Sequence, residues 1–170
     1  MSNFDICESA IVLQKVIFFS TFNSLALNST KFLFVSLMST KVEHVFFVDI
    51  NQTNRNFVKY RAKKLGVEKK LTLCKTIQDT KILKFDTIVC LDVLEHLADP
   101  ASQINNFSEI MDGNSIALFN WYFYKGDKNE YPFHVDDRQI VERFFKTLQA
   151  NFLEVFHPIL ITARAYKKIR

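Results

Sequence analysis

The sequence predicts a single α/β domain over residues 1–170, with a mostly parallel sheet, helices on both faces and a C-terminal antiparallel hairpin. Short apolar runs, typical of buried strands, alternate with segments whose apolar residues recur at helical spacing. This alternation indicates βαβ crossovers, which produce a parallel sheet covered on both sides. Two strand-like runs at the end follow each other directly, which predicts the hairpin. We therefore expect three layers, α/β/α.

The expected elements follow in order along the chain. Each helical segment shows apolar residues on one side, and two of them stop just before Gly66 and Gly113, as glycine favours helix ends. The hairpin is expected to turn at His157 and Pro158. Strands are predicted at residues 15–19, 44–49, 70–74, 85–91, 115–120, 152–156 and 159–166, and helices at residues 54–65, 101–111 and 136–150.

Composition excludes several classes of protein. A chain of 170 residues with 18 Phe is long enough for one bulky aromatic core. Three cysteines without a CxxC pair indicate free thiols in a reducing compartment, and no apolar run reaches the roughly 20 residues of a membrane span. We therefore expect a cytoplasmic protein without a membrane partner. The net charge of +4 collects in short runs typical of solvated surfaces, which leaves at most a weak attraction to an anionic partner.

Asp49 closes the second predicted strand. Ligands of parallel sheets bind at the carboxyl ends of the strands, where an acidic side chain can accept both hydroxyl hydrogens of a ribose. The same residue type also favours the N-cap of a following helix. Both interpretations of Asp49 remain open at this point.

The fourth predicted strand runs into Cys90-Leu-Asp-Val-Leu-Glu-His-Leu-Ala-Asp-Pro100. This stretch resembles the motif after the fourth strand of class I S-adenosylmethionine-dependent methyltransferases of the small-molecule type. The resemblance implies a Rossmann-like sheet of strand order 3-2-1-4-5-7-6 and S-adenosylmethionine as cofactor. It also implies that Asp49 binds the cofactor ribose, that Leu91 and Asp92 flank its methionine portion, and that Asp79 lies near the adenine.

The chain departs from this family after the first predicted strand. The family carries an acidic residue there and a Gly-x-Gly-x-Gly loop, because glycines let the backbone approach the cofactor. Here Phe18 takes the place of the acidic residue, and Ser20, Phe22 and Ser24 take the places of the three glycines. Either the cofactor contacts this loop differently, or the site is vestigial.

Asp92, Glu95 and His96 form a second group, at spacing i, i+3, i+4. In the first turn of a helix all three would point to one side. The pattern resembles the metal-binding arrangement of small-RNA 3′-end 2′-O-methyltransferases and certain quinone-pathway O-methyltransferases, with His134 as a fourth ligand. Carboxylates with imidazoles suit a divalent metal such as Mg²⁺, Mn²⁺ or Zn²⁺. Without a metal, His96 or His134 is the candidate general base.

Three functions remain in competition. The first is methyl transfer to an oxygen or nitrogen of a small-molecule acceptor, for which residues 121–124, Trp-Tyr-Phe-Tyr, offer either stacking rings or ordinary strand packing. The second is a catalytically inactive binding module or partner subunit. The third is metal-assisted ribose methylation of RNA, although no extended basic and aromatic stretch favours a nucleic-acid partner. Either the acceptor pocket is open, or a second copy of the chain in a homodimer, or a partner subunit, closes it.

Overall fold

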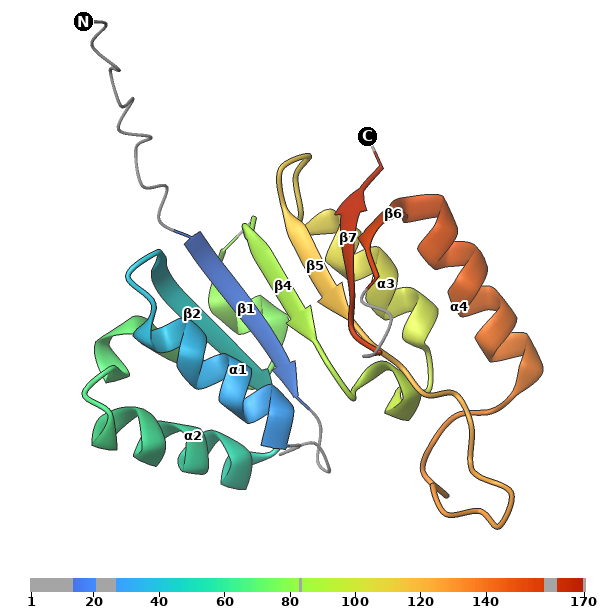
Figure 1. The fold of residues 1–170 in the computed structure, drawn as a ribbon, viewed down its shortest axis with the longest axis horizontal. Helices are drawn as coiled ribbons and strands as arrows, with labels where there is room; N and C mark the ends of the chain where they lie inside the picture. The colour runs from blue at the N-terminus through green and yellow to red at the C-terminus, as the bar shows by residue number, and fades with distance from the viewer. Residues whose placement is uncertain (1–13, 21–26, 83, 158–161, 170) are drawn as a thin grey trace, which may run out of the picture.

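The computed structural model describes residues 14–20, 27–82, 84–157 and 162–169 (Figure 1). Seven strands form one sheet in the order β3-β2-β1-β4-β5-β7-β6. The pairs among β1 to β5 are parallel, whereas β7 is antiparallel to both β5 and β6. This confirms the predicted fold class, the C-terminal hairpin and the strand order.

The strands differ from the predicted ranges mainly at their ends. The third strand starts later, because Glu68–Lys70 forms a 3₁₀ turn. The second strand of the hairpin starts at Arg164 rather than at residue 159 and continues to Lys168, while residues 158–161 lie outside the described residues. The strands are β1 (Gln14–Ser20), β2 (Val42–Asp49), β3 (Leu71–Cys74), β4 (Thr87–Cys90), β5 (Ile116–Phe119), β6 (Phe152–Phe156) and β7 (Arg164–Lys168).

Helices begin at side-chain caps that the sequence supplies. The Asn51 side chain accepts a hydrogen bond from the Thr53 amide at the start of α2, and Asp137 caps α4 in the same way. The end of α2 is fixed by Gly66, whose φ of 67° is the left-handed conformation that glycine adopts readily. The helices are α1 (Leu27–Met38), α2 (Gln52–Lys64), α3 (Pro100–Glu109) and α4 (Arg138–Asn151), with further 3₁₀ turns η2 (Ile77–Thr80) and η3 (Leu94–His96).

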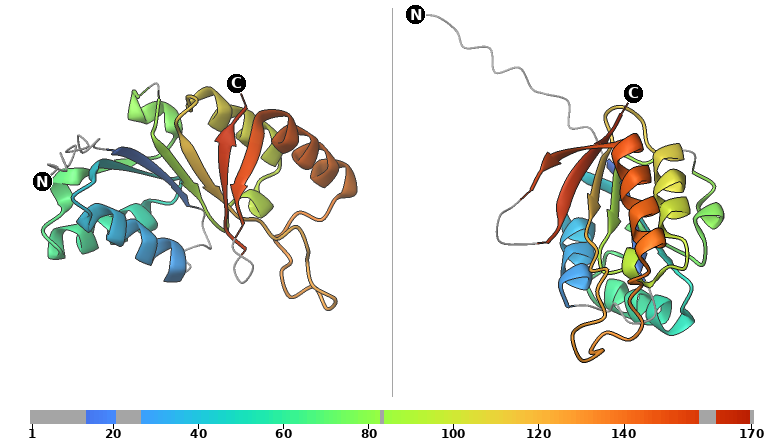
Figure 2. Two further views of the ribbon diagram at one scale, coloured as in Figure 1. Left: turned by 45° about the horizontal axis from the view of Figure 1, so that its top comes forward. Right: turned by 90° about the vertical axis from the view of Figure 1, so that its right-hand side faces the viewer.

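The helices bury two separate cores against the sheet. On one face, α1 and α2 cover residues such as Phe18, Val45 and Phe47. On the other face, α3 and α4 cover an aromatic cluster that includes Phe107 and Phe119. Figure 2 (right) shows the sheet between α1 on one side and α3 and α4 on the other. The many phenylalanines therefore serve largely as core, as their number predicts.

The topology places a switch point at β1. This strand pairs with β2 on one side and with β4 on the other, so the chain crosses over in opposite directions from it. The carboxyl ends of β1, β2, β4 and β5 lie at one edge of the sheet, where ligands of open α/β sheets bind. The side chains at this edge form the candidate site.

Candidate functional site

A cavity of about 320 Å³ lies at the carboxyl ends of β1 and β2. Phe19 and Asp49 line it from the two strands, Thr76 and Gln78 from the segment after β3, and Asn106 from α3. Val93 and Leu97, on either side of η3, complete the wall next to β4. Its volume is at the lower end of the range of small-molecule pockets, about 300 to 1,000 Å³.

Asp49 is buried in the wall of this cavity. Its Oδ1 accepts a hydrogen bond from the Asn51 amide at 2.7 Å, and its Oδ2 accepts one from Asn54 Nδ2 at 2.8 Å. The N-cap of α2 is Asn51, so the structure does not use Asp49 as the cap. A carboxylate oxygen accepts up to two hydrogen bonds, which leaves acceptor capacity for the hydroxyls of a ribose.

The Asp79 carboxylate turns toward its own backbone. Its Oδ2 accepts hydrogen bonds from the amides of Lys75 at 3.0 Å and Thr76 at 2.8 Å, and it forms a capping box for η2. The bond from the Thr76 amide holds the pKa of Asp79 below its usual value. Thr76 and Gln78, rather than Asp79, line the cavity.

The substituted glycine loop is described only at its first residue. Ser20 ends β1, opposite Asp49 in the pairing with β2, whereas Phe22 and Ser24 lie outside the described residues. Phe18 faces the core beneath α1 and α2. Phe19 faces the cavity, with its ring 4.8 Å from that of Phe107. The first strand therefore presents an aromatic side chain to the cavity.

Asp92 adopts a conformation that the helical interpretation did not predict. Its φ is 56°, and η3 begins only at Leu94, so the expectation that Asp92 shares a helix turn with Glu95 and His96 is wrong. The Asp92 amide donates to Asn120 Oδ1 at 2.6 Å, and Asn120 Nδ2 donates to Asp92 Oδ1 at 2.8 Å. This pair links the ends of β4 and β5. Leu91 packs toward the core of α1 and α2.

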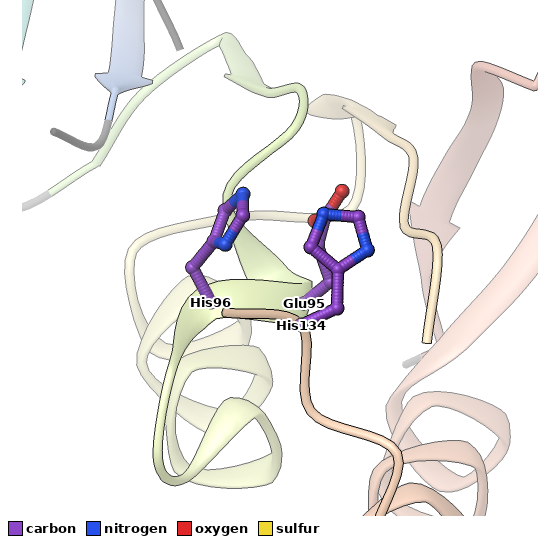
Figure 3. A group of neighbouring side chains, drawn as sticks. All are labelled: Glu95, His96 and His134. Atoms are coloured by element: carbon purple, nitrogen blue, oxygen red, sulfur yellow. The ribbon is translucent and has the colours of Figure 1, made fainter. Parts of the chain in front are cut away.

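Glu95, His96 and His134 come together at the same edge of the sheet (Figure 3). One possible ligand atom from each lies within 4.8 Å of the others, and the two imidazole rings are 4.8 Å apart between centroids. The Val135 amide donates to the Glu95 carbonyl at 2.7 Å, which holds the loop after β5 against η3. Among the described residues, this is the one such group of histidine, cysteine and acidic side chains. Asp92, predicted as a ligand together with these three residues, lies outside the group.

The Glu95–His96–His134 cluster is electrostatically unsatisfied. Glu95 is 2% exposed, and its Oε2 and the Nδ1 of His96 have no hydrogen-bond partner within the part of the chain that the structure describes. Burial raises the pKa of Glu95 to about 7, with a smaller contribution from the Asp92 charge. Burial, aided by His134, lowers the pKa of His96. The cluster therefore favours a proton or a cation between its ligand atoms.

We expect Glu95→Gln to remove a pH dependence of stability. Because folding raises the pKa of Glu95 from 4.5 to about 7, its stabilising contribution is complete below pH 4.5 and is lost as the pH rises to 7. The difference in unfolding free energy between wild type and variant should fall by at most about 3 kcal/mol across this window. Urea unfolding at intervals from pH 4.5 to 8 measures it. A constant difference would contradict the buried, protonated carboxyl, and the change should level off about one pH unit above the pKa of Glu95.

Comparison with known proteins identifies the family. Residues 29–119, more than half of the chain, match a family model described as a methyltransferase domain. The chain belongs to the methyltransferase domain family. No curated protein sequence matches the chain.

Solved structures with the same fold share little sequence with this methyltransferase domain. The ribosomal protein L11 methylase of Lactobacillus delbrueckii subsp. bulgaricus is 15% identical, with a TM-score of 0.62 over 95% of this chain and 72% of its own. A proposed rRNA methylase of Clostridium thermocellum is 16% identical (TM-score 0.63, 92% and 87%). A proposed caffeoyl-CoA O-methyltransferase of Staphylococcus aureus is 14% identical (TM-score 0.61, 93% and 77%). At these identities they support the fold and do not identify an acceptor.

S-adenosylmethionine is the cofactor of this methyltransferase domain, and the cavity fits it. The buried Asp49 carboxylate, with spare acceptor capacity, suits the sugar hydroxyls of a nucleoside. Phe19, Val48 and Ile77 supply apolar surface in the same wall. No helix among the described residues has the length and apolar character needed to cross a membrane.

Some residues of the site carry no signal in the sequence. Nothing in the sequence indicates a role for Asn120, yet its side chain fixes Asp92 by two hydrogen bonds between the ends of β4 and β5. The Tyr124 carbonyl lies 3.1 Å from His134 Nδ1. Because a carbonyl oxygen only accepts, Nδ1 carries the proton and Nε2 is the free acceptor of His134. Only the folding of the loop after β5 brings these groups together.

Proposed function

We propose that this methyltransferase domain transfers a methyl group from S-adenosylmethionine to an oxygen or nitrogen of a small-molecule acceptor. The observation that carries the proposal is the convergence of Glu95, His96 and His134 within 4.8 Å of one another. Val93 and Leu97, which lie on either side of η3 and so flank Glu95 and His96, also line the cofactor cavity. The cluster therefore borders the place where a methyl donor and an acceptor would meet.

The side chains supply positioning and a proton acceptor. The cofactor supplies a methyl group on a sulfonium, so its bond to sulfur breaks as the bond to the acceptor forms. The acceptor must lose a proton, and an imidazole nitrogen of His96 or His134 suits that step. Burial keeps His96 neutral by lowering its pKa, and Nε2 of His134 is free to accept. The remaining rate acceleration comes from holding the methyl donor and the acceptor in line.

The same three residues fit a divalent metal ion. Glu95 Oε2 and His96 Nδ1 are buried and unpartnered among the described residues, and one carboxylate with two imidazoles is a donor set of zinc and related ions. A bound ion would lower the pKa of an acceptor hydroxyl. This favours, as a second candidate function, metal-assisted ribose methylation of RNA. In both cases Glu95, His96 and His134 hold the reacting hydroxyl.

Calorimetric titration with S-adenosylmethionine and S-adenosylhomocysteine tests the cofactor part of the proposal. Replacing Asp49 by Asn removes a charged acceptor of two hydroxyl hydrogens, so we expect the dissociation constant to rise about 10- to 100-fold. Asp112→Asn, an exposed carboxylate at a turn before β5, is the matched control and should leave the affinity unchanged. Folded wild-type protein that binds neither compound would overturn the proposal and favour the inactive binding module or partner subunit.

Product analysis tests the transfer itself. S-adenosylmethionine with a labelled methyl group is incubated with small hydroxyl and amine compounds and with an RNA oligonucleotide, with and without EDTA. We expect label in a small molecule. Transfer to RNA alone would overturn the small-molecule proposal, and loss of transfer with EDTA would identify the metal-dependent form.

A further inference from the structure

The segment that follows β5 sorts its aromatic side chains onto two faces. Trp121 and Phe123 point into the core, with their rings 5.1 Å and 4.8 Å from that of Phe144 on α4. Tyr122 and Tyr124 alternate with them and are 48% and 42% exposed. Core packing against α4 therefore accounts for Trp121 and Phe123 and does not involve the two tyrosines.

The exposed tyrosines meet a third one beside the cluster. The ring of Tyr131 stacks on His134 with 5.0 Å between centroids and an interplanar angle of 15°. Tyr122 places its ring edge-on to Tyr131 at 5.5 Å and to His134 at 5.8 Å. Tyr122, Tyr124 and Tyr131, here called the tyrosine wall, thus adjoin the proposed proton acceptor. Clustered exposed aromatic surface of this kind marks a binding site more often than a chance exposure.

The loop that carries the tyrosine wall is internally braced. The Tyr131 amide donates to the Lys125 carbonyl at 2.8 Å, and Lys125 pairs with Asp136 at 3.3 Å. Gly126 has a φ of 85°, and a Cβ at this position would lie 1.9 Å from the Glu130 side chain. Figures 1 and 2 show the loop projecting from the body of the domain beyond the carboxyl ends of the strands. The wall is therefore built into the fold next to the site.

We propose that the tyrosine wall is the acceptor subsite and that it selects a planar aromatic molecule bearing a hydroxyl group; this rests on the proposed function. A flat ring gains stacking and edge contacts on tyrosine rings that a saturated ring lacks. Because Tyr131 and Tyr122 both contact the His134 ring, a ring bound against them places its hydroxyl near His134 and the cofactor cavity. The wall thus supplies the orientation that methyl transfer needs.

Charge favours a small molecule over a nucleic-acid strand at this wall. Residues 121–138 carry three basic and four acidic side chains, a formal net charge of −1. Nucleic-acid sites neutralise phosphates with an excess of lysine and arginine. The basic runs at residues 61–64 and 69–70 belong to α2 and the turn after it, away from this loop (Figure 1). A neutral aromatic acceptor carries no phosphates, so its binding site needs no excess of basic side chains.

Binding of two matched probes tests the inference. Catechol and trans-cyclohexane-1,2-diol carry the same two hydroxyls, but only catechol has an aromatic face. Each is titrated calorimetrically into protein saturated with S-adenosylhomocysteine, with EDTA present so that no metal contributes. We expect catechol to bind at least tenfold more tightly than the diol. Equal affinity for the two would overturn the inference.

Variants of the tyrosine wall test whether catechol binds there. Tyr131→Leu should weaken catechol about 3- to 10-fold, whereas Tyr131→Phe should retain it, because stacking needs the ring and not the phenol group. Tyr60→Leu, at an exposed tyrosine of α2, is the control and should change nothing. Unchanged affinity in Tyr131→Leu would overturn the inference, as would tighter binding of an RNA oligonucleotide that depends on the tyrosine wall.

The two proposals fail in different ways. If catechol binds through Tyr131 but no acceptor is ever methylated, the proposed function is wrong and the aromatic site stands. If a saturated acceptor is methylated as efficiently as an aromatic one, and Tyr131→Leu leaves that rate unchanged, the function stands and the inference is wrong.

Discussion

We expect Phe119→Ala to lower the free energy of unfolding by about 3–5 kcal/mol. Phe119 is fully buried at the end of β5 and contacts rings from three other elements. Its centroid lies 5.2 Å from Phe107 on α3, 5.6 Å from Phe152 on β6 and 5.5 Å from Tyr166 on β7. Truncation leaves a cavity where the sheet, its hairpin and a helix meet, so little of it can be filled by relaxation.

Urea unfolding, followed by far-UV circular dichroism, measures this effect. Phe133→Ala is the matched control, because that side chain is 73% exposed and its truncation should change stability by less than about 0.5 kcal/mol. A loss below about 1 kcal/mol in Phe119→Ala would mean that the hairpin does not depend on this aromatic contact.

The central strands could be predicted because they are buried on both faces. Residues 44–49 and 115–120 are apolar enough to exclude other assignments, and the structure places β2 and β5 there. The ends of elements depend on local contacts instead. Glu68–Lys70 turns into a 3₁₀ helix before β3, and Arg164, rather than residue 159, starts the final strand. The order of the strands came from the resemblance to a family and not from periodicity.

The candidate site was predictable where it depends on the edge of the sheet. Glu95, His96 and His134 follow strands that end at one edge, and the structure brings them together. Asp92 was placed wrongly in a helix turn with Glu95 and His96, because its pairing with Asn120 exists only once β4 and β5 lie side by side. The Asp79 carboxylate accepts hydrogen bonds from the backbone amides of Lys75 and Thr76. Residue spacing does not predict such a local interaction, which competes with binding of a ligand.

The sequence alone does not predict which side chains of residues 121–124 are buried, because this depends on the position of α4. Alternation alone predicts that Trp121 and Phe123 share one face and Tyr122 the other. Which face is covered depends on α4, whose Phe144 packs against Trp121. Once α4 is in place, the tyrosines are the pair left beside His134.

We expect His134→Asn to lower kcat for methyl transfer by about 10²- to 10⁴-fold, with little change in the affinity for S-adenosylmethionine. The Tyr124 carbonyl accepts a hydrogen bond from Nδ1, which leaves Nε2 as the nitrogen that can act as a base, and asparagine does not replace it. Steady-state rates with catechol, and calorimetry with the cofactor, separate the two quantities. His44→Asn is the control. His44 on β2 forms a hydrogen bond with Thr72 on β3, so this variant should keep wild-type kcat.

The pH profile distinguishes a base from a side chain that only supports the tyrosine wall. A base acts in its neutral form, so wild-type kcat should rise with pH through the pKa of an imidazole and then level off. Because burial lowers the pKa of His96, a profile that depends on His96 has its midpoint below pH 6.5. If His134→Asn raises KM for catechol and leaves kcat unchanged, His134 positions the aromatic acceptor through Tyr131, and the proton passes to His96. If both His96→Asn and His134→Asn keep wild-type kcat, neither imidazole accepts the proton, and the methyl acceptor must react as an already ionised group.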